Sequence, residues 1–260
     1  MARTAAVWDP AQYLRFANER LRPALDLLAR VPLDTPARVV DLGCGPGNVT
    51  AILKQRFPEA DVAGVDGSAA MLEKARATVA NCRFELADFF QWQPAEPLDL
   101  IFSNAALHWV DRHATLFPRL LSFLTTGGVL AVQMPAMYDM PLRRIPYELA
   151  AAKPWAEYLG DVTSAPSILP PMEYWDLLRP HVASLDLWQT TYMHALRGEN
   201  AVMEWAAGSS LRPFLDRLPD DRKAEFRQAY SDATRPHHPR RPDGTTLLPF
   251  HRLFMVARKG

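Results

Sequence analysis

The sequence has little cysteine and no excess of either charge, and both absences exclude classes of function. The only two cysteines among 260 residues, Cys44 and Cys82, show no metal-ligand spacing, which argues against a zinc site and fits a reducing compartment. Lys and Arg together number 29, as do Asp and Glu, so the formal net charge is zero. A neutral chain gives no electrostatic reason to expect a nucleic acid or an anionic membrane as partner.

Long hydrophobic runs are also absent. No stretch reaches the roughly 18 apolar residues that a membrane-spanning helix needs, and Met1–Pro10 lacks the apolar core of a secretion signal. We therefore expect a soluble, cytoplasmic protein, and a monomer or a weak homodimer. Because 48% of the 260 residues are hydrophobic, the chain can bury one substantial core, and we expect a single domain over residues 1–260.

The most informative stretch runs from Val39 to Asn48, where a buried strand meets a glycine-rich turn. Arg38–Leu42 has the short, β-branched character of a parallel strand covered on both faces. Glycine then occupies every second position of Gly43–Gly47, which permits positive φ and lets a ligand approach the backbone. A helix that opens near Asn48 would add unpaired N–H groups. The pattern predicts a cofactor loop, and the alternative is a plain tight connection.

An acidic residue stands at the end of the next predicted strand. Asp61–Asp66 predicts a second strand, and its last residue lies about twenty residues beyond the glycine loop, where a carboxylate can accept both ribose hydroxyls of a nucleotide. Gly67-Ser68 would then begin a helix, with Met71 one turn in. The alternative for Asp66 is a plain charge at the start of that helix.

The third and fourth predicted strands also end on polar residues. Asn81–Ala87 is followed by Asp88-Phe89, and Leu98–Ser103 is followed by Asn104-Ala105. In a doubly wound sheet, ligands bind in the crevice at the carboxyl ends of the strands. We therefore expect Asn104 and Ala105 to border the cofactor. The alternative for Asp88 is an aspartate in a turn beside core phenylalanines.

The remaining elements complete an α/β pattern. Five β-α units in sequence predict a parallel first half, with Thr126-Gly127-Gly128 as the turn before a fifth strand. Two further strands and two helices are predicted at Leu185–Leu196, Thr246–Arg258, Glu199–Ala206 and Asp220–Ala233. We expect Asp220 to be the N-cap of the last helix, because it follows Pro219.

Other segments depart from this pattern. Pro135–Pro180 holds eight of the 23 prolines, and we interpret residues 135–183 as a helical cap inserted after the fifth strand. Near the N-terminus, a helix that ends at Val31-Pro32 is predicted by apolar residues at helical spacing: Tyr13, Leu14, Phe16, Leu21, Leu25 and Leu28. Arg235–Gly244 is interpreted as a solvated, proline-broken loop rather than a metal or phosphate site.

The run Asp41-x-Gly43-x-Gly45-x-Gly47, with an acid two residues before the first glycine, resembles the S-adenosylmethionine loop of class I methyltransferases. The resemblance implies an α/β fold: a doubly wound, mostly parallel seven-stranded sheet with an antiparallel last strand. It implies S-adenosylmethionine as cofactor and a lid formed by residues 1–32. We expect no metal, because no His, Asp, Glu or Cys cluster has ligand spacing and displacement on a methyl group needs no Lewis acid. Asp88 would recognise the adenine amino group, and Phe89 would border the ring. The residues that we place at the cofactor are Asp41, Gly43, Cys44, Gly45, Gly47, Asp66, Gly67, Met71, Asp88, Phe89, Asn104 and Ala105.

Nearly the whole chain also resembles the trans-aconitate 2-methyltransferase family. The specific signatures are Gln133-Met134-Pro135, Leu211-Arg212-Pro213 and Arg252-Leu253-Phe254. The chain departs from the family pattern at His108, Ala136-Met137, Ser209-Ser210 and His251. The resemblance implies esterification of one carboxylate of a small polycarboxylic acid such as trans-aconitate. Because the departures fall where substrate choice is expected, the methyl donor is implied more firmly than the acceptor.

Methyl transfer to a carboxylate needs positioning more than it needs acid-base chemistry. A carboxylate is already a nucleophile at neutral pH, so holding it in line with the methyl group is the main task, and this can supply about 7–11 kcal/mol. Arginines would hold the other carboxylates of the acceptor. The candidates are Arg143, Arg144, Arg212 and Arg252, with His108, Tyr147 and Tyr192 as neutral donors. The alternative for each arginine is a surface side chain whose stem packs on apolar residues.

Two other classes of function stay open at this point. One is a methyltransferase for another small acid, or for O, N or C of a secondary metabolite. The other is a non-catalytic S-adenosylmethionine-binding protein. Release of S-adenosylhomocysteine with a panel of acceptors would separate them.

Overall fold

A computed structural model describes residues 17–137, 140–162 and 168–260. The N-terminal helix that the leucine spacing predicts is seen as α2 (Ala17–Leu28), while Tyr13 and the rest of the segment before it lie outside the described residues. Of the helices in the described ranges, none is long and apolar enough to cross a membrane.

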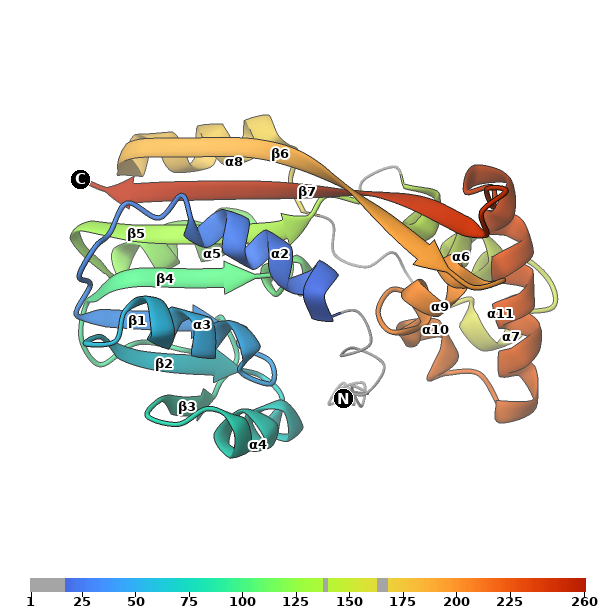
Figure 1. Cartoon of the computed structure of the whole chain (residues 1–260), viewed down its shortest axis with the longest axis horizontal. Helices are drawn as coiled ribbons and strands as arrows, with labels where there is room; N and C mark the ends of the chain where they lie inside the picture. The colour runs from blue at the N-terminus through green and yellow to red at the C-terminus, as the bar shows by residue number, and fades with distance from the viewer. Residues whose placement is uncertain (1–16, 138–139, 163–167) are drawn as a thin grey trace. The chain divides into compact units, whose positions relative to one another are not determined.

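A seven-stranded sheet forms the main body of the fold (Figure 1). Its strand order is β3-β2-β1-β4-β5-β7-β6. Strands β1 to β5 pair in parallel, and β7 pairs with β5 in antiparallel orientation. The predicted α/β fold class, including the antiparallel last strand, is confirmed. The strands are β1 (Arg38–Leu42), β2 (Asp61–Asp66), β3 (Arg83–Leu86), β4 (Leu98–Asn104), β5 (Leu124–Pro135), β6 (Val182–Arg197) and β7 (Thr245–Lys259).

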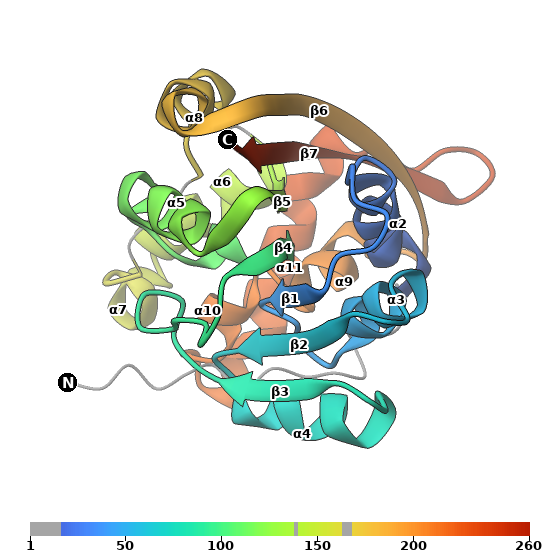
Figure 2. The ribbon, with the colours of Figure 1, turned by 90° about the vertical axis from the view of Figure 1, so that its left-hand side faces the viewer.

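Helices cover both faces of this sheet, which explains the uninterrupted apolar character of its central strands. Figure 2 shows α2 and α3 (Asn48–Arg56) on one face, and α5 (His113–Ser122) and α8 (Pro171–Leu178) on the other. Leu42, Leu100, Ile101 and Val132 are 0% exposed. Strands buried on both faces need no alternation of polar residues.

The chain forms two compact units. The sheet unit comprises Arg20–Pro135, Pro166–Thr190 and Arg252–Gly260, and the helical unit includes the described residues of Ala136–Ala165 and Thr191–His251. Helices of the helical unit are α6 (Pro141–Ala151), α7 (Ala156–Leu159), α9 (Ala201–Ala207), α10 (Arg212–Leu215) and α11 (Asp220–Thr234). The expected cap at residues 135–183 stays a prediction, and α8 within that range groups with the sheet unit.

The helical unit has a core of its own, built from its helices and from Leu248 and Phe250 of β7. The Trp155 and Phe226 rings pack edge to face at 5.2 Å. Tyr230 is buried, and its hydroxyl donates to the carbonyl of Leu142 at 3.1 Å. This hydrogen bond satisfies the polar end of an otherwise apolar side chain, as buried tyrosines require.

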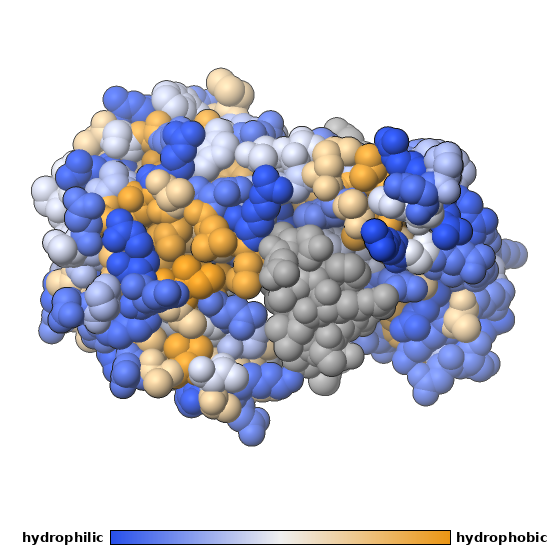
Figure 3. Space-filling view, in the orientation of Figure 1, coloured by the Kyte–Doolittle hydropathy of each residue, from blue (hydrophilic) through white to orange (hydrophobic). Residues whose placement is uncertain are grey.

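Helix α2 does not bury every leucine whose spacing predicts it. Ala24 and Leu27 are 2% and 0% exposed, whereas Leu25 is 48% exposed. The helix carries apolar residues on two adjacent stripes, and spacing by itself cannot say which of them faces the sheet. Figure 3 shows an apolar patch on the surface of the sheet unit, near α2.

Two further sequence predictions need correction. Thr126-Gly127-Gly128 is not a turn before β5 but part of it, with Gly127 at φ 78°. The pairing of β4 with β5 shifts register between Leu98 and Leu100, so β5 absorbs the glycines as an irregularity rather than ending there. Asp220 is the first residue of α11 rather than its N-cap, which is Pro219. Its carboxylate instead pairs with Lys223 at 2.6 Å.

Candidate functional site

The predicted cofactor residues gather at the carboxyl ends of β1, β2 and β4 in the sheet unit. These three strands are neighbours in the sheet, in the order β2-β1-β4. The loop after β1 is anchored to the end of β2, because the amides of Gly43 and Cys44 both donate to the carbonyl of Val65, at 2.7 and 3.0 Å. The sheet topology therefore places the glycine loop beside Asp66, as the crevice rule for such sheets expects.

Gly43 and Gly45 are required for different reasons. Gly43 has φ 82°, and a Cβ there would lie 2.1 Å from Cβ of Ala106, so close packing excludes any side chain. Gly45 has φ 53°, and a Cβ there would meet nothing within 4 Å. The backbone at Gly45 thus faces open space, as a loop must if it is to receive a ligand.

Asp66 holds the loop while keeping acceptor capacity for a ligand. Its Oδ2 accepts from the amide of Gly45 and its Oδ1 from the amide of Ser68, both at 2.8 Å. Burial raises the pKa of Asp66, and these two backbone hydrogen bonds oppose that shift. Each carboxylate oxygen has two lone pairs, so one on each oxygen remains for hydroxyl donors such as those of a ribose.

Asp41 lies below the loop and is 1% exposed. Its Oδ2 accepts from the hydroxyl of Thr50 at 2.6 Å. Burial raises the pKa of Asp41 to about 7, an effect that the Thr50 hydrogen bond opposes and the nearby Asp66 charge reinforces. Thr50, on α3, was not singled out from the sequence; a threonine one turn into the helix after a glycine loop was the available signal.

Three further residues predicted to contact the cofactor around this loop are Cys44, Met71 and Gly67. Cys44 is 5% exposed, and burial raises the pKa of its thiol, so it is an inert, space-filling group rather than a nucleophile. Met71 is 5% exposed on α4 (Ala69–Thr78), and its amide donates to the hydroxyl of Ser68, the N-cap of α4, at 3.4 Å. Gly67 precedes this cap, and a Cβ there would meet only the carbonyl of Ala87, at 3.8 Å.

Asp88 and Phe89 follow β3, and Phe89 lies next to the glycine loop. Asp88 is exposed, and its Oδ1 accepts from the amide of Phe90 at 2.8 Å, which forms a local turn. The ring of Phe89 borders the loop, because its Cζ would lie 3.3 Å from a Cβ on Gly43. This position suits the proposed contact with an adenine ring, and Asp88 keeps its other oxygen available.

Asn104 is the last residue of β4, and Ala105 begins the turn that follows it. Ala105 adopts φ 52°, a conformation that costs a residue with a side chain about 1–2 kcal/mol. Its amide donates to the carbonyl of Gln133 at 2.9 Å. The Oδ1 atom of Asn104 is buried and accepts no hydrogen bond from the described residues. A strained backbone beside an unsatisfied acceptor makes this position a candidate for ligand contact.

Two of the predicted catalytic residues belong to the sheet unit. His108 lies in the short 3₁₀ turn Leu107–Trp109, with its ring 4.6 Å from that of Trp109. Arg252 is 4% exposed at the start of the β7 segment that pairs with β5, opposite Pro135. Its Nη1 donates to Oε1 of Gln133 at 3.2 Å. Arg252 is therefore a buried, oriented cation, not a surface arginine.

The other two predicted catalytic residues belong to the helical unit. Arg212 begins α10 and pairs with Asp216 at 3.3 Å, with 16% of its side chain exposed. Tyr192, on β6, is 4% exposed and stacks on His194 with ring centroids 6.4 Å apart. Of the weaker candidates, Arg144 pairs with Glu148, and Tyr147 packs edge to face on Phe214 at 5.0 Å.

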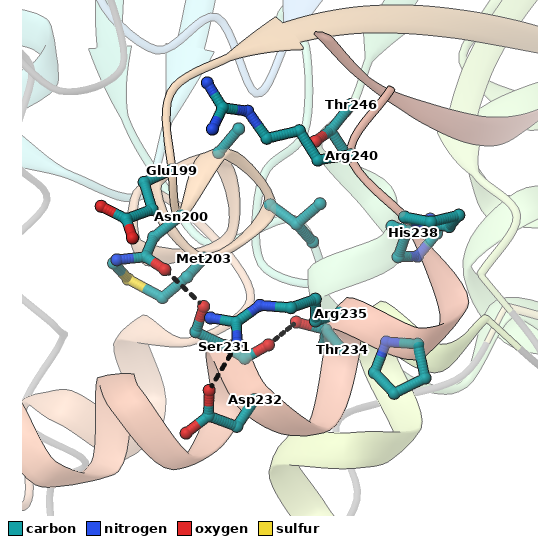
Figure 4. A pocket seen from close by; sticks show the side chains of 14 residues that line it. Glu199, Asn200, Met203, Ser231, Asp232, Thr234, Arg235, His238, Arg240 and Thr246 are labelled. Atoms are coloured by element: carbon teal, nitrogen blue, oxygen red, sulfur yellow. Dashed lines mark hydrogen bonds and ion pairs between the residues drawn. The ribbon is translucent and has the colours of Figure 1, made fainter. Parts of the chain in front are cut away.

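The helical unit contains a cavity of about 740 Å³ that the sequence did not indicate (Figure 4). It lies between the start of α9, the end of α11 and the segment that follows α11. On its walls, Ser231 donates to Asn200 at 2.7 Å, and Arg235 pairs with Asp232 at 3.3 Å. His238, expected in a solvated loop, is 8% exposed and lines the cavity. None of the predicted site residues lines it.

Gln133, which contacts Arg252 in the sheet unit, is a polar residue that we did not predict as part of the site from the sequence. It is 0% exposed on β5 and stands among the apolar residues Val132 and Met134. The available signal was a lone amide in an otherwise apolar strand.

Among the described residues, no group of three or more His, Cys, Asp or Glu side chains could hold a metal ion.

Comparison with known proteins agrees with this geometry. A family model for the methyltransferase domain matches residues 39–128, which span β1 to the first part of β5. The trans-aconitate 2-methyltransferase of Methylobacterium radiotolerans is 49% identical over 257 residues, covering 98% of this chain and 99% of the relative. That of Azoarcus sp. (strain BH72) is 49% identical over 250 residues, covering 96% and 98%.

Solved structures share the fold at much lower identity. A candidate methyltransferase from Bacillus halodurans C-125 has a TM-score of 0.60 at 15% identity and covers 92% of this chain and 99% of its own. Haemonchus contortus phosphoethanolamine N-methyltransferase 2, in complex with S-adenosyl-L-methionine, has a TM-score of 0.55 at 15% identity, covering 92% and 53%. Because the curated relatives match along almost their whole length, the chain belongs to the trans-aconitate 2-methyltransferase family of class I methyltransferases.

Proposed function

We propose that this protein transfers the methyl group of S-adenosylmethionine to one carboxylate of trans-aconitate and releases the monomethyl ester. The observation that carries the proposal is the match to trans-aconitate 2-methyltransferases at 49% identity over 98% of the chain. The geometry of the sheet unit supports it, because a glycine loop with an open backbone face lies beside a carboxylate that retains acceptor capacity.

The residues of the loop fit S-adenosylmethionine, which supplies a methyl group on a positively charged sulfur. Gly43–Gly47 would receive it against bare backbone, since a Cβ at Gly45 would occupy otherwise open space. Asp66 would accept the ribose hydroxyls, and Asp88 and Phe89 would contact the adenine. The buried Oδ1 of Asn104, which has no partner among the described side chains and backbone, would suit the ammonium of the methionine part.

The acceptor would be held by cations, because burying a multiply charged acid is costly unless its carboxylates are paired. Arg252 and Arg212 are the proposed cations, with His108 and Tyr192 as neutral donors. The reacting carboxylate would be left weakly bonded so that it stays nucleophilic. No residue needs to act as a base, since the acceptor is already ionised at neutral pH.

The proposal also covers the metal requirement, the location, the oligomeric state, the lid and the cap. We propose that the reaction needs no metal, that the protein works in the cytoplasm as a monomer or weak homodimer, and that residues 1–32 and 135–183 serve as lid and cap. The acceptor is a small molecule, and neither a nucleic acid nor a membrane is a proposed partner.

A single assay tests the proposed function. The protein is incubated with methyl-labelled S-adenosylmethionine and a panel of tricarboxylic, dicarboxylic, monocarboxylic, amine and phenol acceptors, with and without a chelator. We expect labelled monomethyl ester from trans-aconitate, with stoichiometric S-adenosylhomocysteine, in both conditions. Product from a monocarboxylic or aromatic acid but not from trans-aconitate would contradict the proposal and favour another small-molecule methyltransferase. Loss of activity with the chelator, restored by a divalent cation, would contradict the metal-free part.

A further inference from the structure

Gln133 is a fully buried amide at the carboxyl end of β5. It is 0% exposed, and its register partners are Asn104 on β4 and Phe254 on β7. A polar group in such a place destabilises the fold unless it is hydrogen-bonded. Each polar atom of the Gln133 amide is therefore expected to have a hydrogen-bond partner.

The neighbouring Arg252 determines which way this amide points. Nη1 of Arg252 lies 3.2 Å from Oε1 of Gln133. A guanidinium has donors and no acceptor, so the atom that faces it must be the carbonyl oxygen of the amide. The amide nitrogen, Nε2, is consequently turned away from the guanidinium. Nε2 is buried and finds no acceptor in the part of the chain that the structure describes.

These side chains share one face of the sheet. Gln133 and Asn104 are directly opposite each other in the β4–β5 ladder, and Gln133 and Phe254 in the β5–β7 ladder. Arg252 lies two residues from Phe254 on the same strand and therefore points to the same face. The face thus carries a cation, an amide donor and, at Asn104, the site of the proposed methyl donor.

Residue 133 carries an amide and not a carboxylate, and this difference changes the charge beside Arg252. Glutamate has nearly the same shape and would also accept from Arg252, but its charge would neutralise the guanidinium. Glutamine orients Arg252 without placing a negative charge beside it, and it adds N–H donors of its own. A buried donor beside a buried cation is complementary to an anion with two oxygens.

We propose that Gln133 is a specificity-determining residue that binds, together with Arg252, one non-reacting carboxylate of the acceptor. Nε2 of Gln133 donates to one oxygen of that carboxylate, and the Arg252 guanidinium donates to the other. The inference rests on the proposed function, since it assigns a recognition role toward the same acceptor. Such a contact would fix the orientation of the polycarboxylate and leave a different carboxylate to react.

Two near-isosteric variants and a control test this role. Gln133→Glu keeps an acceptor for Arg252 but removes the donors and adds a repelling charge. Gln133→Met removes all polar atoms and is apolar like its neighbours Val132 and Met134. Gln189→Glu makes the same chemical change at an exposed position of β6. The measurements are kcat and KM for trans-aconitate, affinity for S-adenosylhomocysteine by calorimetry, and Tm.

We expect Gln133→Met to raise KM for trans-aconitate about 10- to 100-fold, the range for losing a hydrogen bond to a charged group, and Gln133→Glu to raise it further. Affinity for S-adenosylhomocysteine should stay within twofold, and Gln189→Glu should match the wild type. If the wild type makes the ester and a folded Gln133 variant keeps its KM within twofold, the inference is wrong while the proposed function stands. If the wild type makes no ester, the proposed function fails and takes this inference with it.

A measurement on the wild type covers the case in which neither variant folds. Analogues of trans-aconitate in which one carboxylate is replaced by a neutral, isosteric amide are compared as inhibitors. For one non-reacting position, the replacement should weaken binding about tenfold or more. Equal inhibition by all analogues would overturn the inference.

Discussion

The amide of Gly45 donates a 2.8 Å hydrogen bond to Oδ2 of Asp66, which ties the glycine loop after β1 to the end of β2. The same carboxylate accepts from Ser68 at 2.8 Å, just before α4 begins. One acidic side chain therefore organises two loops of the proposed cofactor site. These bonds hold the carboxylate in place and leave lone pairs for the proposed ligand.

Replacing Asp66 with Ala should weaken S-adenosylmethionine binding by about 2–3 kcal/mol, because hydrogen bonds to a charged group contribute about 1.5–3 kcal/mol. Calorimetry measures the loss. Asp61→Ala, at the exposed start of the same strand, is the matched control and should bind normally. Unchanged affinity in a folded Asp66→Ala variant would remove Asp66 from the site.

The two glycines should separate folding from binding. Gly43→Ala places a Cβ 2.1 Å from Ala106 and should strongly destabilise the fold, whereas Gly45→Ala meets no atom within 4 Å. Gly45→Ala should cost only the left-handed backbone strain, about 1–2 kcal/mol, yet abolish measurable cofactor binding. Thermal unfolding and calorimetry on both variants check this. Normal cofactor affinity in Gly45→Ala would show that no ligand approaches that backbone.

Replacing Arg212 with Ala should lower kcat/KM for trans-aconitate by about 2–5 kcal/mol, the typical cost of leaving a buried charge without its partner. Affinity for S-adenosylhomocysteine should not change. Arg217→Ala is the control, because Arg217 also lies in the helical unit and also pairs with an aspartate, Asp161, at 3.3 Å. Equal kinetics in the two variants would show that Arg212 does not bind the acceptor.

His113 should make the protein less stable in acid. It is 3% exposed, its Nδ1 pairs with the Tyr174 hydroxyl, and its Nε2 lies 3.0 Å from the carbonyl of Leu107. Burial lowers its pKa below the usual 6.5. The unfolded chain therefore binds a proton that the folded chain does not, and stability should fall as pH drops below about 6.5.

Urea unfolding between pH 5 and pH 8 measures this effect. His113→Gln should flatten the acid slope, which can reach about 1.4 kcal/mol per pH unit for one proton. His181→Gln, at an exposed position of the same unit, should keep the slope of the wild type. The same slope in His113→Gln would assign the acid sensitivity to other groups.

Asp41 should have the opposite pH dependence. Its pKa is raised from 3.8 to about 7 by burial, so the folded state holds a proton that the unfolded chain releases. Stability should therefore decline as pH rises from about 4 to about 7. Asp41→Asn, which can still accept from Thr50, should remove this decline and be more stable than the wild type at pH 8. A variant less stable than the wild type at pH 8 would contradict this.

Much of the sheet unit was determined by the sequence itself. The apolar run at Val39-Val40 and the glycines after it can satisfy their backbone and packing in few ways other than a buried strand that turns into a helix. The acid that ends β2 was recognisable for the same reason, because the carboxyl ends of adjacent parallel strands converge. The class of acceptor was predicted from the resemblance of nearly the whole chain to one family, because no short motif indicates it.

Other features were decided only when strands came into register. Nothing in the local sequence says that Gln133 faces Arg252, because the two are brought together by the β5–β7 pairing of residues far apart in the chain. The buried stripe of α2 was undecided for a related reason, since two apolar stripes were available and the sheet selected one. The sequence thus indicated which groups are candidates for the chemistry, while tertiary packing decided which of them are buried, oriented and left with unsatisfied hydrogen-bonding atoms.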